Sequence, residues 1–122
     1  MNKKILILNG HQYYDVVAKG ELTQQYINKA NDFFLKNGFE VKHTNIEKGY
    51  EKEEECEKFE WADYVLFQYP VYWMSVPWIA KKYIDETFTQ GRHYSSDGRS
   101  RSDDSKLYGS GGLLQGKKYM LS

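Results

Sequence analysis

The stretch that decides the fold is "KKILILNG", residues 3–10. Its apolar residues form one continuous run, which Asn-Gly ends, and they do not alternate with polar residues. A run of this kind predicts a strand that is buried on both faces, which is typical of parallel sheets. We therefore expect a parallel sheet that is covered on both sides, with a helix directly after this strand.

Helices and further strands are expected to alternate along the rest of the chain. Apolar residues recur at helical spacing from Leu22, and Gly38 is placed to end this helix in a left-handed conformation. The patterns further predict strands at residues 39–46, 62–70 and 117–122, and helices at residues 51–61 and 77–88. Strands that alternate with helices in this way predict an open α/β sheet wound by right-handed crossovers.

The two later helices are expected to be amphipathic. The acidic run at residues 51–61 predicts a helix with a solvated acidic face. In the two helices together, the side chains expected to face inward are Phe59, Trp61, Ile79, Tyr83 and Ile84, and those expected to face water are Lys81, Lys82 and Asp85.

Composition limits the class of protein and its partners. The chain has 122 residues, 40% of them hydrophobic, which predicts one globular domain over residues 1–122. The 17 basic and 17 acidic residues give zero formal net charge, and no local basic patch is visible, so we expect no nucleic-acid or membrane partner. Cys56 is the single cysteine, which excludes an intrachain disulfide and favours a reducing, cytoplasmic setting.

The last third of the chain differs from the rest. Residues 89–116 are rich in Gly, Ser and mixed charge, and they are much longer than the usual connection of about 4–6 residues. Such a segment is expected to be a binding lid or disordered. An α/β domain that stops on its fourth strand would lack a strand and covering helices. We therefore expect a C-terminally incomplete domain, with the apolar residues of "ILIL" (5–8) and "YVLF" (64–67) left uncovered.

A ligand site is expected where two loops meet beyond the strands. In parallel sheets, ligands bind at the carboxyl ends of the strands where the strand order reverses, here between the first and third strands. Residues 9–23 bring the start of a helix to this point, whose free N–H groups suit phosphate, and Gly20 allows close approach. The second loop, "YPVYWMSVPW" (69–78), holds both prolines and two of the three tryptophans. The combination predicts a nucleotide-type cofactor with a flat ring.

The motifs that the first loop lacks narrow the choice of cofactor. Residues 9–23 contain neither G-x-G-x-x-G nor G-x-x-x-x-G-K-[ST]. These motifs carry the dinucleotide fingerprint of Rossmann dehydrogenases and the P-loop, respectively. A resident NAD cofactor and ATP hydrolysis are therefore both disfavoured.

Residues 61–91 and 108–122 resemble the flavodoxin-like NAD(P)H:quinone oxidoreductases, and are most similar to the modulator of drug activity B branch. The stretch "SDGRSRSDDSKLYGSGG" (96–112) is similar to the same branch. The resemblance covers nearly the whole chain. It implies a flavodoxin-like three-layer sandwich with a parallel sheet, truncated after the fourth strand, because the family's flavin-edge loop would follow Ser122. It also implies tightly held FAD, a homodimer, and two-electron reduction of quinones by NADPH or NADH.

The resemblance also assigns cofactor contacts. Pyrophosphate and ribityl contacts fall on Ala18, Gly20, Leu22, Thr23 and Gln25, and ring contacts fall on Pro70, Val71, Tyr72, Trp73 and Met74. His11 matches a histidine near the phosphates, with an exposed loop histidine as the alternative, and Tyr108 matches a tyrosine near the cofactor. Relatives tend to have Ser at the position of Ala18 and Asn at that of Thr23. Core or dimer contacts are the alternative for the aromatic cluster at residues 72–74.

Other candidate residues are assigned no role in binding. His43 and His93 are expected at the surface without metal-ligand spacing, and Arg92, Arg99 and Arg101 are expected to be solvated loop charges. No side chain is predicted to be a catalytic acid, base or metal ligand.

Two hypotheses about function follow. The first is a quinone reductase in which a flavin takes hydride from NAD(P)H and passes it to a quinone in substituted-enzyme order. The alternative is a non-catalytic flavin-binding electron carrier or interaction module. An electron carrier would usually expose an acidic surface around the ring, whereas residues 89–116 carry mixed charge.

Overall fold

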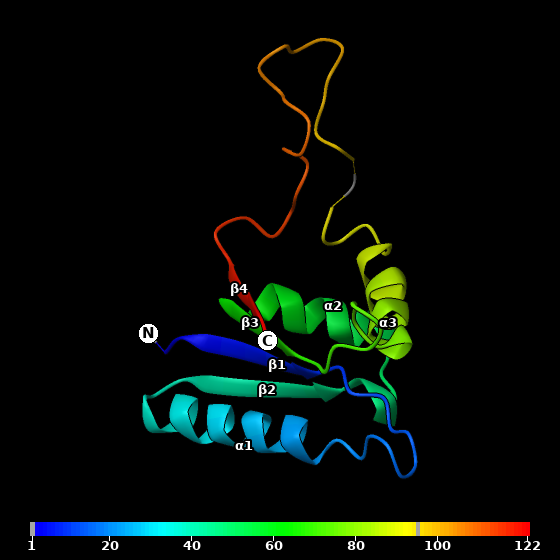
Figure 1. Ribbon diagram of the computed structural model, residues 1–122. Coiled ribbons are helices and arrows are strands. Elements are labelled where there is room, and N and C mark those ends of the chain that lie inside the picture. Colours follow the sequence, from blue (N-terminus) through cyan, green and yellow to red (C-terminus); the bar gives the residue numbers. More distant parts are fainter. Residues whose placement is uncertain (1, 95) are drawn as a thin grey trace.

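The computed structural model describes residues 2–94 and 96–122, and its centre is a four-stranded parallel sheet (Figure 1). The strands are β1 (Lys4–Asn9), β2 (Glu40–Asn45), β3 (Tyr64–Gln68) and β4 (Lys118–Leu121). Their order is β2-β1-β3-β4, and every neighbouring pair is parallel. The chain moves from β1 to one side and then to the other, so the strand order reverses at β1. This confirms the predicted winding.

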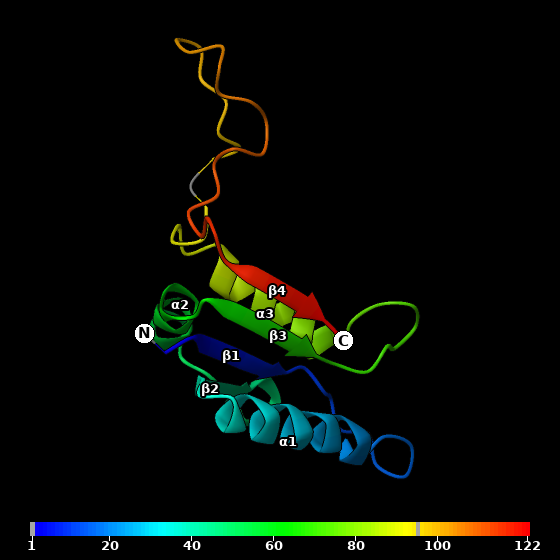
Figure 2. The same cartoon turned by 90° about the vertical axis from the view of Figure 1, so that its left-hand side faces the viewer.

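Helices cover both faces of the sheet, which makes the predicted three layers (Figure 2). Helix α1 (Glu21–Lys36) lies on one face, and α2 (Lys52–Trp61) and α3 (Trp78–Phe88) lie on the other. A short 3₁₀ helix, η1 (Ile46–Lys48), follows β2. No helix in the described part of the chain is long and apolar enough to cross a membrane.

Strand β1 supplies the centre of both cores. Ile5 and Ile7 pack in the cluster with Ile27 of α1, while Leu6 and Leu8 pack in the cluster with Tyr83 of α3. Alternate residues of a strand point to opposite faces, so a strand covered on both faces is apolar at every position. This explains why the run in "ILIL" is continuous.

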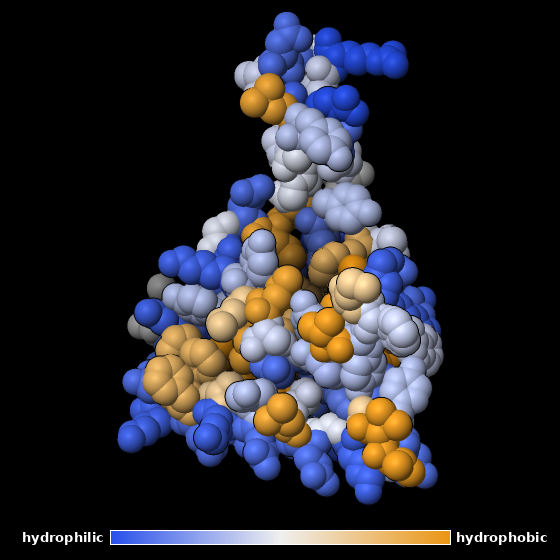
Figure 3. Space-filling model, in the orientation of Figure 1, coloured by the Kyte–Doolittle hydropathy of each residue, from blue (hydrophilic) through white to orange (hydrophobic). Residues whose placement is uncertain are grey.

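The prediction that "ILIL" would be left uncovered is wrong. Its four residues are at most 3% exposed, because β1 is central and has a helical layer on each side. In "YVLF", Leu66 and Phe67 are also buried. The exposed strand is β4, where Tyr119 is 79% exposed, and Figure 3 shows apolar side chains on this face below the projecting segment. Exposure therefore depends on the position of a strand in the sheet.

Helix α1 ends as predicted. Gly38 has a φ of 81°, and its N–H donates to the carbonyl of Leu35, while the N–H of Phe39 donates to the carbonyl of Phe34. These two bonds are the Schellman pattern, in which glycine adopts the left-handed conformation at low cost. The Phe34 and Phe39 rings are 4.9 Å apart and close the end of the helix.

The acidic run contains one buried carboxylate, which the prediction of a solvated face missed. Glu55 is 1% exposed and accepts hydrogen bonds from Thr44 Oγ1 (2.7 Å), Tyr83 OH (2.7 Å) and Lys58 Nζ (3.0 Å). We call these four residues the Glu55 cluster. It joins β2, α2 and α3. Because the carboxylate has partners on three sides, its burial is tolerated.

Two residues that were predicted to be solvated are held at the start of the long segment. His93 is 7% exposed, lies 4.6 Å from the Phe59 ring and 4.8 Å from the Phe88 ring, and neither of its nitrogens has a partner in the described residues. Arg92 forms two hydrogen bonds with Glu60 and one with Glu53. The prediction for His93 is wrong, because α2 and α3 present the Phe59 and Phe88 rings at this point, whereas Arg92 stays partly exposed and pairs with acidic side chains of α2.

The rest of the long segment projects away from the sheet (Figures 1 and 2). Tyr94 and Gly112 form a bridge at its base, and Gly109 N donates to the carbonyl of Asp97. Arg99 and Arg101 are exposed, as predicted, and Arg99 pairs with Asp97. Ser95 of this segment lies outside the described residues.

Candidate functional site

Two loops meet at the carboxyl ends of β1 and β3. The β1–α1 loop (residues 10–20) starts with Gly10, whose N–H donates to the carbonyl of Gln68 at the end of β3. A Cβ on Gly10 would lie 3.1 Å from the Phe67 ring and from the Cβ of Tyr69, which is tighter than ordinary contact. Glycine thus lets the first loop pass directly over the start of the β3–α3 loop (residues 69–77).

The first turn of α1 offers free N–H groups at this junction. Its N-cap is Gly20, with a φ of 83° and no side-chain cap, and the first helical bond runs from Gln24 N to the Gly20 carbonyl. The N–H groups of residues 21–23 therefore have no partner within the helix. Together with the positive end of the helix dipole, these groups form a site suited to a phosphate.

His11 lies against this turn. It is 7% exposed, so it is not an exposed loop histidine, and a Cβ on Gly20 would lie 2.8 Å from its Nδ1. Its Nε2 is 3.1 Å from the Tyr72 hydroxyl, which donates to the carbonyl of Gln12 at 3.0 Å. Because the single hydroxyl proton serves Gln12, Nε2–H of His11 donates to the oxygen of Tyr72. The imidazole therefore joins the two loops.

Between the loops lies a pocket of about 500 Å³, which we call the switch-point pocket. Seven of the twelve residues predicted from the resemblance line it: His11, Ala18, Gly20, Leu22, Thr23, Pro70 and Tyr72. Seven further lining residues were not predicted: Val16, Val17, Lys19, Glu21, Tyr26, Gln68 and Tyr69. Most of these residues neighbour a predicted one in the sequence, and Tyr26 lies one helical turn after Leu22, so helical spacing could have found it.

Five predicted residues do not line this pocket. Gln25 is exposed on α1, and Tyr108 is 77% exposed on the projecting segment. Val71, Trp73 and Met74 are 69%, 96% and 93% exposed. The exposure of Trp73 and Met74 also excludes the alternative that these two side chains belong to the core.

The direction of Trp73 and Met74 follows from a tight turn. Tyr72 and Ser75 exchange both backbone hydrogen bonds, and the residues between them have positive φ angles of 51° and 65°. Positive φ at both central residues defines a type I′ turn, which normally holds Asn or Gly. For other L-residues this conformation costs roughly 1–2 kcal/mol each. The turn sends the two large side chains outward and Tyr72 inward.

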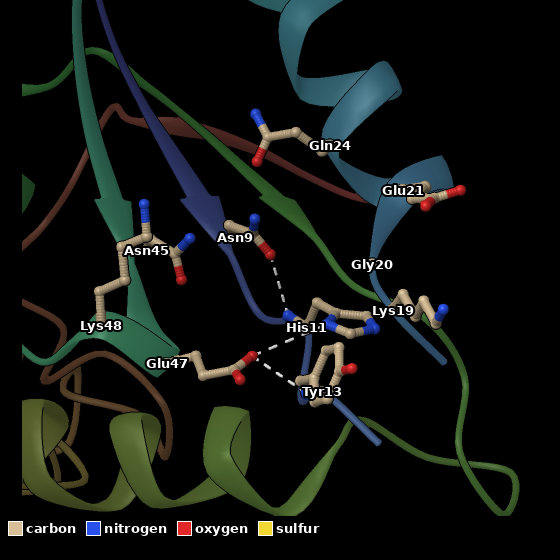
Figure 4. Close-up of a pocket in the computed structure, with 10 residues that line it drawn as sticks. All are labelled: Asn9, His11, Tyr13, Lys19, Gly20, Glu21, Gln24, Asn45, Glu47 and Lys48. Atoms are coloured by element: carbon tan, nitrogen blue, oxygen red, sulfur yellow. Dashed lines mark hydrogen bonds and ion pairs between the residues drawn. The ribbon is translucent and has the colours of Figure 1, made fainter. Parts of the chain in front are cut away.

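A second pocket of about 520 Å³ lies on the other side of His11 (Figure 4), and we call it the side pocket. Its lining residues are Asn9, His11, Tyr13, Lys19, Gly20, Glu21, Gln24, Asn45, Glu47 and Lys48. Asn9 and Asn45 are partners in the register of β1 and β2, so two amides lie side by side where these strands end. The sequence patterns did not predict this pocket, although two predicted neighbouring strands that both end near asparagine were a usable signal.

Glu47 connects the side pocket to the first loop. Its Oε2 accepts from the N–H of Tyr13 at 3.0 Å and lies 3.7 Å from Nδ1 of His11 (Figure 4). On the opposite side of the imidazole, burial raises the pKa of Tyr72, and the nearby Tyr14 and Glu47 raise it further. The Tyr72 hydroxyl thus stays protonated and remains a donor over the ordinary pH range.

A protein family described as having a flavodoxin-like fold (Flavodoxin_2) matches residues 3–122. The chain belongs to this family. The four-strand parallel sheet with helices on both faces agrees with that membership. In flavodoxin-like sheets the ligand lies at the switch point of the strand order, which is where the two loops of this chain meet.

Similar proteins extend the comparison. The flavodoxin-like chain is 47% identical over 120 residues to the NADPH:quinone oxidoreductase MdaB of Haemophilus influenzae. The matched region covers 97% of this chain and 62% of that protein. It spans about three-fifths of the length of the curated relatives that it matches over most of its residues.

Solved structures share the fold at low identity. An NAD(P)H:quinone oxidoreductase from Methanothermobacter marburgensis has a TM-score of 0.69 at 14% identity, covering all of this chain and 86% of the other. General stress protein 14 from Treponema denticola, solved in complex with FMN, has a TM-score of 0.62 at 19% identity, covering 98% and 59%.

Proposed function

We propose that this flavodoxin-like chain is the flavin-binding part of an NAD(P)H:quinone oxidoreductase. The observation that carries the proposal is the switch-point pocket, in which the uncapped start of α1 faces the wall formed by Pro70 and Tyr72. Free N–H groups that can bind a phosphate, together with an aromatic wall in the same pocket, fit a flavin nucleotide. The 47% identity to a named NADPH:quinone oxidoreductase supports the same assignment.

The residues present fit such a cofactor on their own chemistry. The N–H groups of residues 21–23 would hold a phosphate, and the absence of a Cβ on Gly20 lets His11 pack against the start of α1. Leu22 and Tyr26 would line the opposite side from Pro70 and Tyr72. We keep Trp73 and Met74 as proposed ring contacts because they belong to the same loop as Pro70 and Tyr72. Their side chains point outward, so they do not support this part of the proposal.

We propose FAD as the resident flavin, although the Treponema denticola relative was solved with FMN. The reason is the side pocket, which shares His11, Lys19, Gly20 and Glu21 with the switch-point pocket. A mononucleotide would leave the side pocket without a ligand. A dinucleotide has a second nucleoside, whose hydroxyl and ring nitrogen atoms suit the amides of Asn9, Gln24 and Asn45.

When bound, the flavin supplies the two-electron chemistry, in which hydride comes from NADPH or NADH and goes to a quinone. The chain's own residues bind and orient the cofactor, and we assign none of them as a catalytic acid or base. Substituted-enzyme order means that both substrates use one site in turn, so double-reciprocal plots should give parallel lines. A homodimer and a cytoplasmic location belong to the same proposal.

The test is to titrate the protein with FAD and with FMN, and then to follow NADPH oxidation with a water-soluble naphthoquinone. Tighter binding of FAD than of FMN, followed by quinone reduction, is the expected result. Preferred binding of FMN would refute the dinucleotide and leave the flavin assignment. Flavin binding without quinone reduction would favour the electron carrier or interaction module. Binding of neither flavin would contradict the proposed function.

A further inference from the structure

The β3–α3 loop is attached to the β1–α1 loop through the side chain of Tyr72. In the described residues, the hydrogen bonds that join the two loops are those of the Tyr72 hydroxyl, with His11 Nε2 at 3.1 Å and the Gln12 carbonyl at 3.0 Å. The ring also packs against Tyr14, with the ring centres 5.7 Å apart. A single residue of one loop therefore contacts three residues of the other.

The surroundings of Tyr72 distinguish it from its neighbours in the same loop. Val71, Trp73 and Met74 are 69–96% exposed, whereas Tyr72 is half-buried and points in the opposite direction. The type I′ turn is closed by the two bonds between the backbones of Tyr72 and Ser75. The backbone of Tyr72 thus closes the strained turn, and its side chain attaches the same loop to the β1–α1 loop.

The connection continues beyond the two loops. His11 lies between Tyr72 and Glu47. Its Nε2 is hydrogen-bonded to the Tyr72 hydroxyl, and its Nδ1 lies 3.7 Å from the Glu47 carboxylate. Glu47 belongs to η1, which directly follows β2. Side chains therefore link the segments that follow β1, β2 and β3 into one chain of contacts, with the start of α1 packed against its centre at Gly20.

We propose that Tyr72 is a positioning residue whose hydroxyl latches the β3–α3 loop to the β1–α1 loop. The latch sets the spacing between the wall formed by Pro70 and Tyr72 and the N–H groups of residues 21–23 that would bind a phosphate. The latch itself rests on the contacts of Tyr72, His11 and Gln12. Its effect on a flavin rests on the proposed function. A ligand that touches both loops needs the spacing to be fixed before it binds, because ordering the loops at that moment would weaken binding.

The first experiment measures the latch without any flavin. In Tyr72→Phe, amide hydrogen exchange at position 72 and at Ser75 should become about ten-fold faster, because both hydrogen bonds of the hydroxyl that hold the loop are lost. Exchange in β1 should be unchanged, which shows that the fold is intact. Tyr14→Phe is the control, since the Tyr14 hydroxyl makes no hydrogen bond in the described part of the chain and its ring would remain. Unchanged exchange at Ser75 in Tyr72→Phe would overturn the proposal.

The second experiment separates positioning from simple contact. FMN spans the ring and phosphate positions, whereas lumiflavin carries the ring alone and can move with one loop. Tyr72→Phe should raise the Kd of FMN about ten-fold and that of lumiflavin less than about two-fold, and Tyr14→Phe should change neither. An equal loss for both ligands would overturn the positioning role, because it would make Tyr72 merely part of the ring wall. If the unmodified protein binds neither ligand, the proposed function is wrong, and the exchange rates still decide the latch.

Discussion

The Glu55 cluster and the switch-point pocket both contain polar groups, but the two regions treat these groups in opposite ways. In the cluster, a 1% exposed carboxylate accepts hydrogen bonds from Thr44, Lys58 and Tyr83. At the pocket, the first N–H groups of α1 have no side-chain cap, and the adjoining space is about 500 Å³. One region satisfies its polar groups within the chain, and in the other the first N–H groups of α1 have no partner within the helix.

This contrast predicts that the paired polar groups serve stability and that the unpaired helix terminus is available to bind a ligand. A buried polar group costs several kcal/mol unless it is paired, so a complete network such as the Glu55 cluster holds the layers together. Unpaired groups at an open helix terminus are hydrated and cost little until a ligand replaces the water. Changes in the cluster should therefore affect unfolding, and changes at the pocket should affect binding.

The largest effect is expected from Glu55→Ala. It should lower the free energy of unfolding by about 3 kcal/mol, because Tyr83 OH and Thr44 Oγ1 would lose their buried acceptor. Glu57→Ala, an exposed change on the same helix, should alter it by less than about 0.5 kcal/mol. Urea unfolding measures both variants. A similar loss in the two would mean that the cluster does not act as a buried network.

The next effect should appear in binding and separate the two regions. Gly20→Ala should weaken FAD binding at least about 100-fold, or about 2.7 kcal/mol, because its Cβ would lie 2.8 Å from Nδ1 of His11 and displace the imidazole from the start of α1. Gly38→Ala is a matched control, since the φ angles are 83° and 81° but nothing lies within 4 Å of a Cβ on Gly38. Both variants carry the cost of a positive φ, roughly 1–2 kcal/mol, and Gly20→Ala should lose more stability because its Cβ also meets the buried His11. Equal losses of FAD affinity would show that backbone strain, and not the contact with His11, explains the result.

A smaller change is expected in the turn of the β3–α3 loop. Met74→Gly should raise the free energy of unfolding by about 1 kcal/mol, because glycine tolerates the φ of 65° that methionine resists. Val71→Gly lies outside the two positive-φ positions and should lower stability instead. Urea unfolding again measures the pair. Destabilisation by Met74→Gly would show that the exposed methionine contributes more than its conformation costs.

The smallest effect should come from His93, which is buried like the Glu55 cluster but has no hydrogen-bond partner among residues 2–94 and 96–122. Burial lowers its pKa below the ordinary value of 6.5, Glu60 opposes this shift, and Arg92 adds to it. The unfolded chain then binds the proton first, so stability should be lost as pH falls below about 6.5 towards the lower folded pKa. His93→Phe should flatten this dependence between pH 5 and 8. His43, whose pKa is also lowered by desolvation and by Lys58, should supply the slope that remains. An unchanged slope would contradict the assignment.

Much of the fold could be predicted from local patterns. The continuous apolar run at residues 5–8 predicted a doubly covered strand, and helical spacing with Gly38 predicted the extent of α1. These signals work because periodicity and glycine conformation are properties of neighbouring residues. The exposure of β4 and the full burial of β1 could not be assigned correctly in this way, because burial depends on strand order and on which helices lie over each strand.

The candidate site was predicted in part for the same reason. Its place at the carboxyl ends of β1 and β3 follows from the winding, and seven predicted residues line the switch-point pocket. The side pocket was missed because it forms between β2, η1 and α1, where no single loop carries a motif. Side-chain direction in a type I′ turn also follows neither the helical nor the strand period, so the pattern could not tell Tyr72 from Trp73.

Residue patterns predicted the alternation of strands and helices. With the simplest winding, they also predicted a reversal of strand order between the first and third strands, where residues 9–23 meet residues 69–78. Only the tertiary structure decided that Glu55 and His93 are buried, that Trp73 faces outward, and that Tyr72 bonds to His11. The physical reason is distance along the chain. Local periodicity records which face of an element is apolar, whereas the partner of a polar side chain comes from another element, such as Tyr83 for Glu55 and Tyr72 for His11.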